Sequence, residues 1–127
     1  MEILLVEPDV LLARTYARAL EQAGHAVNVA GTAQTAIHAA DDTTPDLVVL
    51  EMQLVSHSGI EFLYEFRSYD DWRKVPVLAL SQVPPGEFMG TWELLQSELG
   101  VQKYLYKPRT TLAKLLKTVD EFATIKP

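Results

Sequence analysis

The sequence predicts a single α/β domain with a doubly wound parallel β-sheet that is covered by helices on both faces. Three observations support this fold class. The chain has 127 residues, which suits one domain large enough to bury a proper core. Short apolar runs typical of buried strands alternate with segments whose apolar residues recur at helical spacing. The two patterns follow one another five times, which favours a doubly wound sheet over an eight-unit barrel.

The first half of the chain supplies three strand–helix units. The predicted strands are residues 2–6, 25–29 and 46–50. Asp9 is the predicted N-cap of the first helix, which ends at Gly24. The second helix begins at a Thr32 cap and is rich in alanine, and the third begins at Gly59.

The second half supplies two further units. The predicted strands are residues 76–80 and a segment within 101–106. A fourth helix is predicted from an apolar face made of Phe88, Trp92, Leu95 and Leu99. Gly100 ends that helix, and a last helix, capped by Thr110 or Thr111, reaches Phe122.

Five such units indicate a flavodoxin-like sheet with right-handed crossovers and the strand order 2-1-3-4-5. In these sheets, binding sites form beyond the carboxyl ends of the strands, where the winding reverses. The side chains that follow the strands are therefore the candidates for function. They are Glu7, Glu51, Ser81 and Lys107, and we expect them to converge at one end of the sheet.

The composition excludes several classes of protein. No cysteine is present, which rules out disulfides and thiolate metal sites and fits a cytoplasmic protein. The net charge is −6 without a Lys/Arg cluster, so we expect no direct contact with nucleic acid. No apolar run approaches the ~20 residues of a membrane span, and no signal peptide is recognisable. We therefore expect no membrane association.

Five short motifs occur in an order that resembles the receiver domain of bacterial response regulators. They are ILLVE followed by Asp9, DLVVL, SGIEFL, VPVLALS and YLYKP, which lie between Glu2 and Phe122. The resemblance implies a two-component signalling module, in which a histidine kinase phosphorylates an aspartate at the end of the third strand. Residues 1–127 would form one such domain, either a whole protein or the N-terminal part of a longer regulator.

The resemblance assigns a role to each candidate residue. In intact members an acidic pair holds Mg²⁺, a hydroxyl and an amine contact the phosphoryl group, and an aromatic residue of the fifth strand turns inward. The matching positions are Glu51 for the phosphoacceptor, Glu7 and Pro8 for the acidic pair, Ser81 for the hydroxyl, Lys107 for the amine and Tyr104 for the aromatic residue. The resemblance also implies a cis peptide bond between Lys107 and Pro108.

Three positions depart from the family's pattern. Pro8 has no side-chain oxygen where a direct Mg²⁺ ligand would stand, and Asp9 is expected to cap a helix instead, so Mg²⁺ binding should be weak or lost. Glu51 is one methylene longer than aspartate, which moves its carboxylate outward by about 1.5 Å. Gln82 stands where the family has a small residue, and it should crowd the entrance to the site.

These departures favour a degenerate pseudo-receiver that works without phosphorylation and is not an enzyme. Glu51 would be a permanent, partial imitation of a phosphorylated aspartate or, with Lys107, only a structural ion pair. The working surface would be residues 86–125, the predicted fourth helix, fifth strand and last helix, and it would pair two copies or dock a protein partner or output domain. Tyr104 and Tyr106 are either an exposed contact pair on the fifth strand or ordinary half-buried tyrosines.

Two other functions remain compatible with the sequence. One is an active phosphoacceptor receiver that is regulated by a histidine kinase. The other is a small flavodoxin-like enzyme or nucleotide binder, although no Gly-rich phosphate loop or Ser/His/Asp order is present. His25, His38 and His57 lack the spacing of metal ligands, and we expect all three at the surface.

Overall fold

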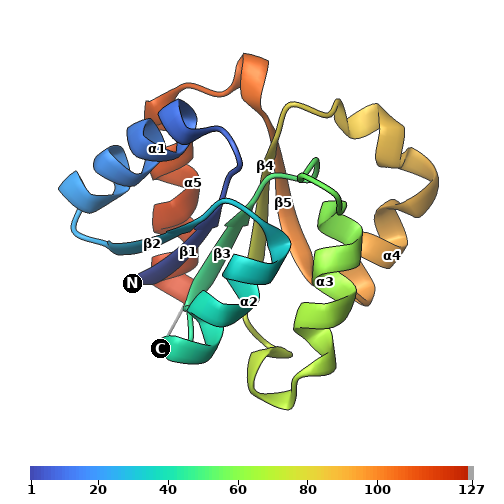
Figure 1. Cartoon of the computed structure of the whole chain (residues 1–127). Helices are drawn as coiled ribbons and strands as arrows, with labels where there is room; N and C mark the ends of the chain where they lie inside the picture. Colours follow the sequence, from blue (N-terminus) through green and yellow to red (C-terminus); the bar gives the residue numbers. More distant parts are fainter. Residues whose placement is uncertain (126–127) are drawn as a thin grey trace.

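Five parallel strands form one sheet in the order β2-β1-β3-β4-β5 in the computed structural model, which describes residues 1–125 (Figure 1). The strands are β1 (Glu2–Val6), β2 (Ala26–Ala30), β3 (Leu47–Leu50), β4 (Val77–Ser81) and β5 (Val101–Tyr106). The register is regular except for a shift between Val77 and Leu78 where β4 pairs with β5. This confirms the predicted doubly wound α/β fold and its strand order.

Helices cover both faces of the sheet (Figure 1). They are α1 (Val10–Gln22), α2 (Ala33–Asp42), α3 (Gly59–Ser68), α4 (Trp92–Ser97) and α5 (Leu112–Ile125), with short 3-10 turns at Asp70–Trp72, Pro85–Thr91 and Lys107–Arg109. Side chains of α1 and α5 pack on one face of the sheet, and those of α2, α3 and α4 pack on the other. Successive residues of a strand point to opposite faces of the sheet. Leu4 of β1 therefore packs with α2, α3 and α4, and Leu5 packs with α1 and α5.

Short polar side chains cap the starts of α1, α2 and α5. Asp9 Oδ1 accepts a hydrogen bond from the Leu12 N–H at 3.0 Å, and Thr32 forms a capping box at α2. Thr111 rather than Thr110 caps α5, since its Oγ1 accepts from the Lys114 N–H at 3.1 Å. Gly24, which follows α1, has φ +99°, a conformation that favours glycine.

The predicted fourth helix is only partly present. Its first part is a 3-10 turn at Pro85–Thr91, and the α-helix covers Trp92–Ser97 alone. Gly86 and Gly90 lower the helix propensity of this segment, and no side chain caps α4. The predicted apolar face is nevertheless the one that packs inward, because Leu95 and Leu99 are buried.

Two other expectations about single residues are corrected. His25 is not a surface residue, since its side chain is only 8 % exposed and its Nδ1 lies 3.1 Å from the Met1 nitrogen. The short link between α1 and β2 brings it to this position beside α5, where its Nε2 is 3.9 Å from Asp120 Oδ1. The Lys107–Pro108 peptide bond is trans, as are all others in residues 1–125.

The loop after β3 is held against the start of α3. The Gly59 N–H donates to the Met52 carbonyl oxygen at 2.7 Å, and a Cβ atom at position 59 would lie 2.8 Å from the Met52 Cα. Glycine is therefore required here by the close approach of two backbone segments. This contact fixes the path of the residues that immediately follow the strand end at Glu51.

Candidate functional site

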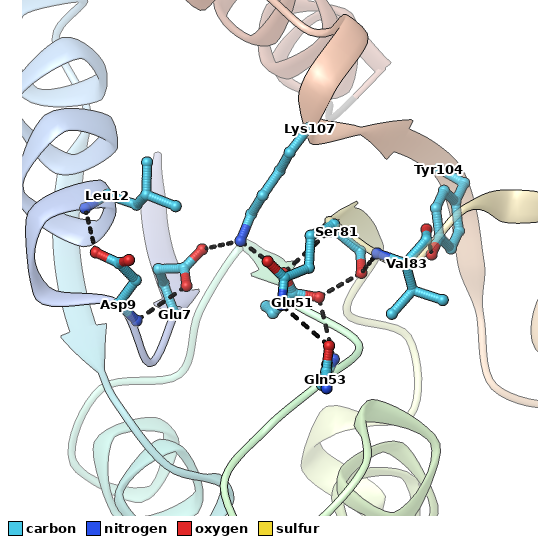
Figure 2. Close-up of polar contacts among 10 residues, drawn as sticks. Glu7, Asp9, Leu12, Glu51, Gln53, Ser81, Val83, Tyr104 and Lys107 are labelled. Atoms are coloured by element: carbon cyan, nitrogen blue, oxygen red, sulfur yellow. Dashed lines mark hydrogen bonds and ion pairs between the residues drawn. The ribbon is translucent and has the colours of Figure 1, made fainter.

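The predicted site residues converge at the carboxyl end of the sheet (Figure 2). Glu7 follows β1, Glu51 follows β3, Ser81 ends β4 and Lys107 follows β5. β1 and β3 are adjacent, and β4 and β5 continue the sheet on the β3 side, so their ends lie at one edge. The structure thus brings together side chains that are up to a hundred residues apart in sequence.

The amine of Lys107 lies between the two acids. Its Nζ is 2.5 Å from Glu7 Oε1 and 2.6 Å from Glu51 Oε1. The three side chains are 9 %, 3 % and 2 % exposed, respectively. These are therefore largely desolvated ion pairs, in which each charge depends on its partners. The expected approach of Glu51 to Lys107 is present, but the contact with Glu7 was not foreseen.

Both oxygens of Glu51 are also engaged with other groups. Oε2 accepts from the Gln53 N–H at 3.0 Å and from the Ser81 hydroxyl (Figure 2). Oε1 accepts from the Gln82 N–H at 3.1 Å. The sequence did not reveal the two backbone donors. Every residue except proline has a backbone N–H, so the pattern of side chains in a sequence does not predict such a contact.

Glu7 is held by the turn that follows β1. Its Oε2 accepts from the Asp9 N–H at 3.1 Å, while its Oε1 is the oxygen that meets Lys107. Pro8 lies between these residues and lines the mouth of the site, as does Asp9, whose side chain is committed to the α1 cap. Within residues 1–125, no group of three or more His, Cys, Asp or Glu side chains could hold a metal ion.

The contacts shift the pKa values of both charged partners. Burial alone would raise the pKa of Glu51, but hydrogen bonds from Lys107, Ser81 and two backbone N–H groups outweigh it, and the pKa is lowered. Burial would lower the pKa of Lys107, but its hydrogen bonds with Glu51 and Glu7 prevail and raise it. Both groups are therefore charged throughout the neutral range.

A chain of hydrogen bonds connects Glu51 to β5. The Ser81 Oγ that donates to Glu51 also accepts from the Val83 N–H at 3.0 Å, and the Val83 carbonyl accepts from the Tyr104 hydroxyl at 2.6 Å. The Tyr104 ring packs against Phe88 and Trp92, with centroid distances of 5.8 and 6.4 Å. Tyr104 is thus half-buried and engaged at both ends, and it does not form an exposed pair with Tyr106.

Gln82 lies at the entrance, where it was expected to restrict access. Its side-chain Nε2 donates to Gln53 Oε1 at 3.0 Å, which joins the loops after β3 and β4 above Glu51. The remaining hollow measures about 260 Å³ and is polar, with Glu7, Glu51 and Lys107 among its lining residues. This bridge between two glutamines is a feature that the sequence did not reveal.

The sheet order and the acids, hydroxyl and amine at its carboxyl end define a receiver-type domain. The sequence matches the response regulator receiver domain over residues 3–120, and the chain belongs to that family. It is therefore a receiver domain of the two-component signalling class. Among residues 1–125, no helix is long and apolar enough to cross a membrane.

Curated relatives are longer regulators. The KDP operon transcriptional regulatory protein KdpE of Escherichia coli K12 is 32 % identical over 106 residues, covering 84 % of this chain and 44 % of KdpE. The probable transcriptional regulatory protein TcrX of Mycobacterium tuberculosis H37Rv is 35 % identical over 79 residues, covering 62 % of this chain and 33 % of TcrX. The chain thus spans less than half the length of these relatives.

Solved structures share the fold over almost the whole chain. The non-phosphorylated HemR receiver domain of Leptospira biflexa has a TM-score of 0.82 and 28 % identity, covering 99 % of this chain and 96 % of that one. A sensor protein of Polaromonas sp. JS666 has a TM-score of 0.85 but only 18 % identity, with 98 % and 96 % coverage, and shows likeness of fold alone.

Proposed function

We propose that this receiver domain is degenerate and acts without phosphorylation, as a protein-interaction module rather than an enzyme. The main support is the set of contacts made by Glu51. In the mechanism that the family resemblance implies, the hydroxyl and the amine meet oxygens of a phosphoryl group. Here Ser81 and Lys107 meet the carboxylate of Glu51 itself. The sequence rather than a kinase would then set the conformation of the site.

The same contacts oppose phosphoryl transfer to Glu51. A nucleophilic oxygen must approach the phosphorus in line, and a misplacement of 1 Å can cost about 10²-fold in rate. Both oxygens of Glu51 already accept hydrogen bonds, and the side chain is 2 % exposed beneath the Gln53–Gln82 bridge. Phosphorylation would require breaking several of these contacts at once.

The donor set at the site does not fit magnesium. Mg²⁺ requires near-octahedral oxygen coordination, usually with carboxylate ligands and several waters. Pro8 offers no side-chain oxygen, and Asp9 is used to cap α1. The oxygens of Glu7 and Glu51 are already bound by N–H, O–H and ammonium groups. The proposed mode of action therefore involves no metal ion at this site.

The proposed working surface is the face formed by the Pro85–Thr91 turn with α4, β5 and α5. It has an apolar hollow of about 400 Å³, lined by Pro85, Gly86, Met89, Trp92 and Tyr104. Met89 is 79 % exposed there, although a large apolar side chain is stabilised by burial. Tyr104 thus connects the site to this hollow, because its hydroxyl end belongs to the hydrogen-bond chain and its ring to the lining.

We propose a second copy of the chain as the occupant of this face. Exposed acids lie on the α4 side and exposed lysines on β5 and the first half of α5: Glu87, Glu93 and Glu98 against Lys103, Lys114 and Lys117. A two-fold axis would place the acidic side of each copy against the basic side of the other. An output domain bound at the same face would instead leave the receiver monomeric when it is purified alone.

Incubation with acetyl phosphate and Mg²⁺, followed by intact mass measurement, tests the proposal. The wild-type chain should stay unmodified. The matched control is the double variant Pro8→Asp, Glu51→Asp, which should bind Mg²⁺ and accept a phosphoryl group if the rest of the site is intact. A stoichiometric phosphoryl adduct on the wild-type chain would contradict the proposal and favour a kinase-regulated receiver.

A further inference from the structure

The contacts of Lys107 suggest what neutralises the two acids of this site. Two carboxylates that face one another in a largely dehydrated pocket repel, and a cation placed between them offsets that repulsion. The Lys107 ammonium is placed there, at 2.5 Å from Glu7 and 2.6 Å from Glu51. Its side chain is 9 % exposed, so bulk water and salt screen it weakly.

We infer that the Lys107 ammonium is the resident cation of this site, bridging Glu7 and Glu51 and excluding a divalent metal ion. This inference rests on the proposed function, since an intact receiver would use a metal at this end of the sheet. An ammonium has three N–H donors, and two of them point at the two acids. Lysine thus supplies, from within the chain, the positive charge that Pro8 prevents a bound metal from supplying.

Removal of the ammonium should turn the site into a metal site. In Lys107→Met the two carboxylates keep their backbone and Ser81 hydrogen bonds but lose their shared cation. Their oxygens suit hard divalent ions such as Mg²⁺ and Mn²⁺. We expect Mn²⁺ and Mg²⁺ to bind K107M at least about tenfold more tightly than the wild-type chain, a gain of at least about 1.4 kcal/mol.

The test is a titration with Mn²⁺ and Mg²⁺, followed by calorimetry and, for Mn²⁺, by electron paramagnetic resonance. The control variant Lys74→Met also removes one positive charge, from an exposed lysine ahead of β4. It should bind Mn²⁺ and Mg²⁺ no more tightly than the wild-type chain. Adding Glu7→Gln to K107M should abolish the gained binding, because Glu51 would be the one buried carboxylate left among residues 1–125 and Asp9 is used to cap α1. Equal metal affinity of wild-type and K107M chains would overturn the inference.

Two further measurements cover the case in which K107M folds poorly. Lys107→Gln keeps a polar side chain in place and should gain metal binding in the same direction. In the wild-type chain, the ¹⁵N signal of the Lys107 ammonium should be unaffected by millimolar Mg²⁺, and its loss on titration would show that the metal displaces it. These readouts are separate from phosphorylation, so an acyl phosphate on Glu51 would refute the proposed function without deciding which cation the acids hold.

Discussion

At the scale of single residues, the end of β3 carries a side chain one methylene group longer than aspartate, Glu51. The longer side chain at position 51 places its carboxylate against the Ser81 hydroxyl and the Lys107 amine. The sequence predicted this approach, because it shows both the length of the glutamate side chain and the positions of these residues at the ends of strands. It could not predict the contact between Lys107 and Glu7, since that depends on the path of a flexible lysine side chain.

The pH dependence of stability should reveal the ionised state of Glu51. Folding lowers the pKa of Glu51 from its ordinary value of 4.5. The ionised carboxylate therefore stabilises the fold above pH 4.5, and this stabilisation is lost as the pH falls through the pKa of Glu51 in the folded chain. We expect Glu51→Gln to reduce the free energy of unfolding at pH 7 by about 1–3 kcal/mol. The difference between the two proteins should shrink below pH 4.5.

Urea unfolding of both proteins across this pH range measures the effect. Glu61→Gln, at the exposed start of α3, is a control for the loss of one carboxylate, although its capping contact with Ser58 carries a small effect of its own. The lowered pKa of Glu51 would be contradicted if the difference in the free energy of unfolding between wild type and Glu51→Gln stayed constant from pH 7 to the acid limit. On the alkaline side, the raised pKa of Lys107 means that its stabilisation is lost only as the pH rises above 10.5.

At the scale of elements, the sequence located every strand and the start of most helices. Strand ends and caps depend on local chemistry, such as the Asp9 and Thr32 side chains that accept helix N–H groups. The fourth helix was overestimated because its apolar spacing continues through a segment that contains Gly86 and Gly90. Periodicity reports which side chains face the core, and it does not distinguish a 3-10 turn from an α-helix.

The contact between the loop after β3 and the start of α3 gives a prediction at this scale. Gly59→Ala should lower the free energy of unfolding by about 1–3 kcal/mol, because the added Cβ would lie 2.8 Å from Met52 Cα and 2.9 Å from its Sδ. Gly86→Ala is the matched control, since nothing lies within 4 Å of a Cβ there. Thermal and urea unfolding compare the two, and an equal effect of both changes would contradict the described packing.

At the scale of the whole molecule, the sequence predicted the fold and pointed to residues 86–125 as the working surface, but it did not reveal the contacts that join that face to the site. Five strand–helix units in 127 residues left few topologies, and the sheet order followed. The proposed face combines residues from Pro85 to α5 that come together only after folding. Tyr104 illustrates this, because its ring and hydroxyl contacts with Trp92 and Val83 depend on how the chain returns after β4.

The proposed pairing of two copies predicts a charge-swap effect. Glu93→Lys or Lys114→Glu alone should weaken dimerisation about 2- to 30-fold, since each pair occurs twice across a two-fold axis and exposed pairs contribute about 0.2–1 kcal/mol each. Mixing the two variants should restore association between them. Analytical ultracentrifugation measures this, with Glu21→Lys on α1 as the control. A monomer at all accessible concentrations would rule out the second copy.

The most direct test of the central claim is the response of the wild-type amide spectrum to beryllofluoride with Mg²⁺. This reagent imitates a phosphoryl group on an accessible carboxylate. If Glu51 already occupies the Ser81 and Lys107 contacts, the amide signals of Ser81, Val83 and Tyr104 should not move at saturating reagent. A second, stoichiometric set of shifted signals at these residues would contradict the claim that the site is closed and needs no phosphorylation.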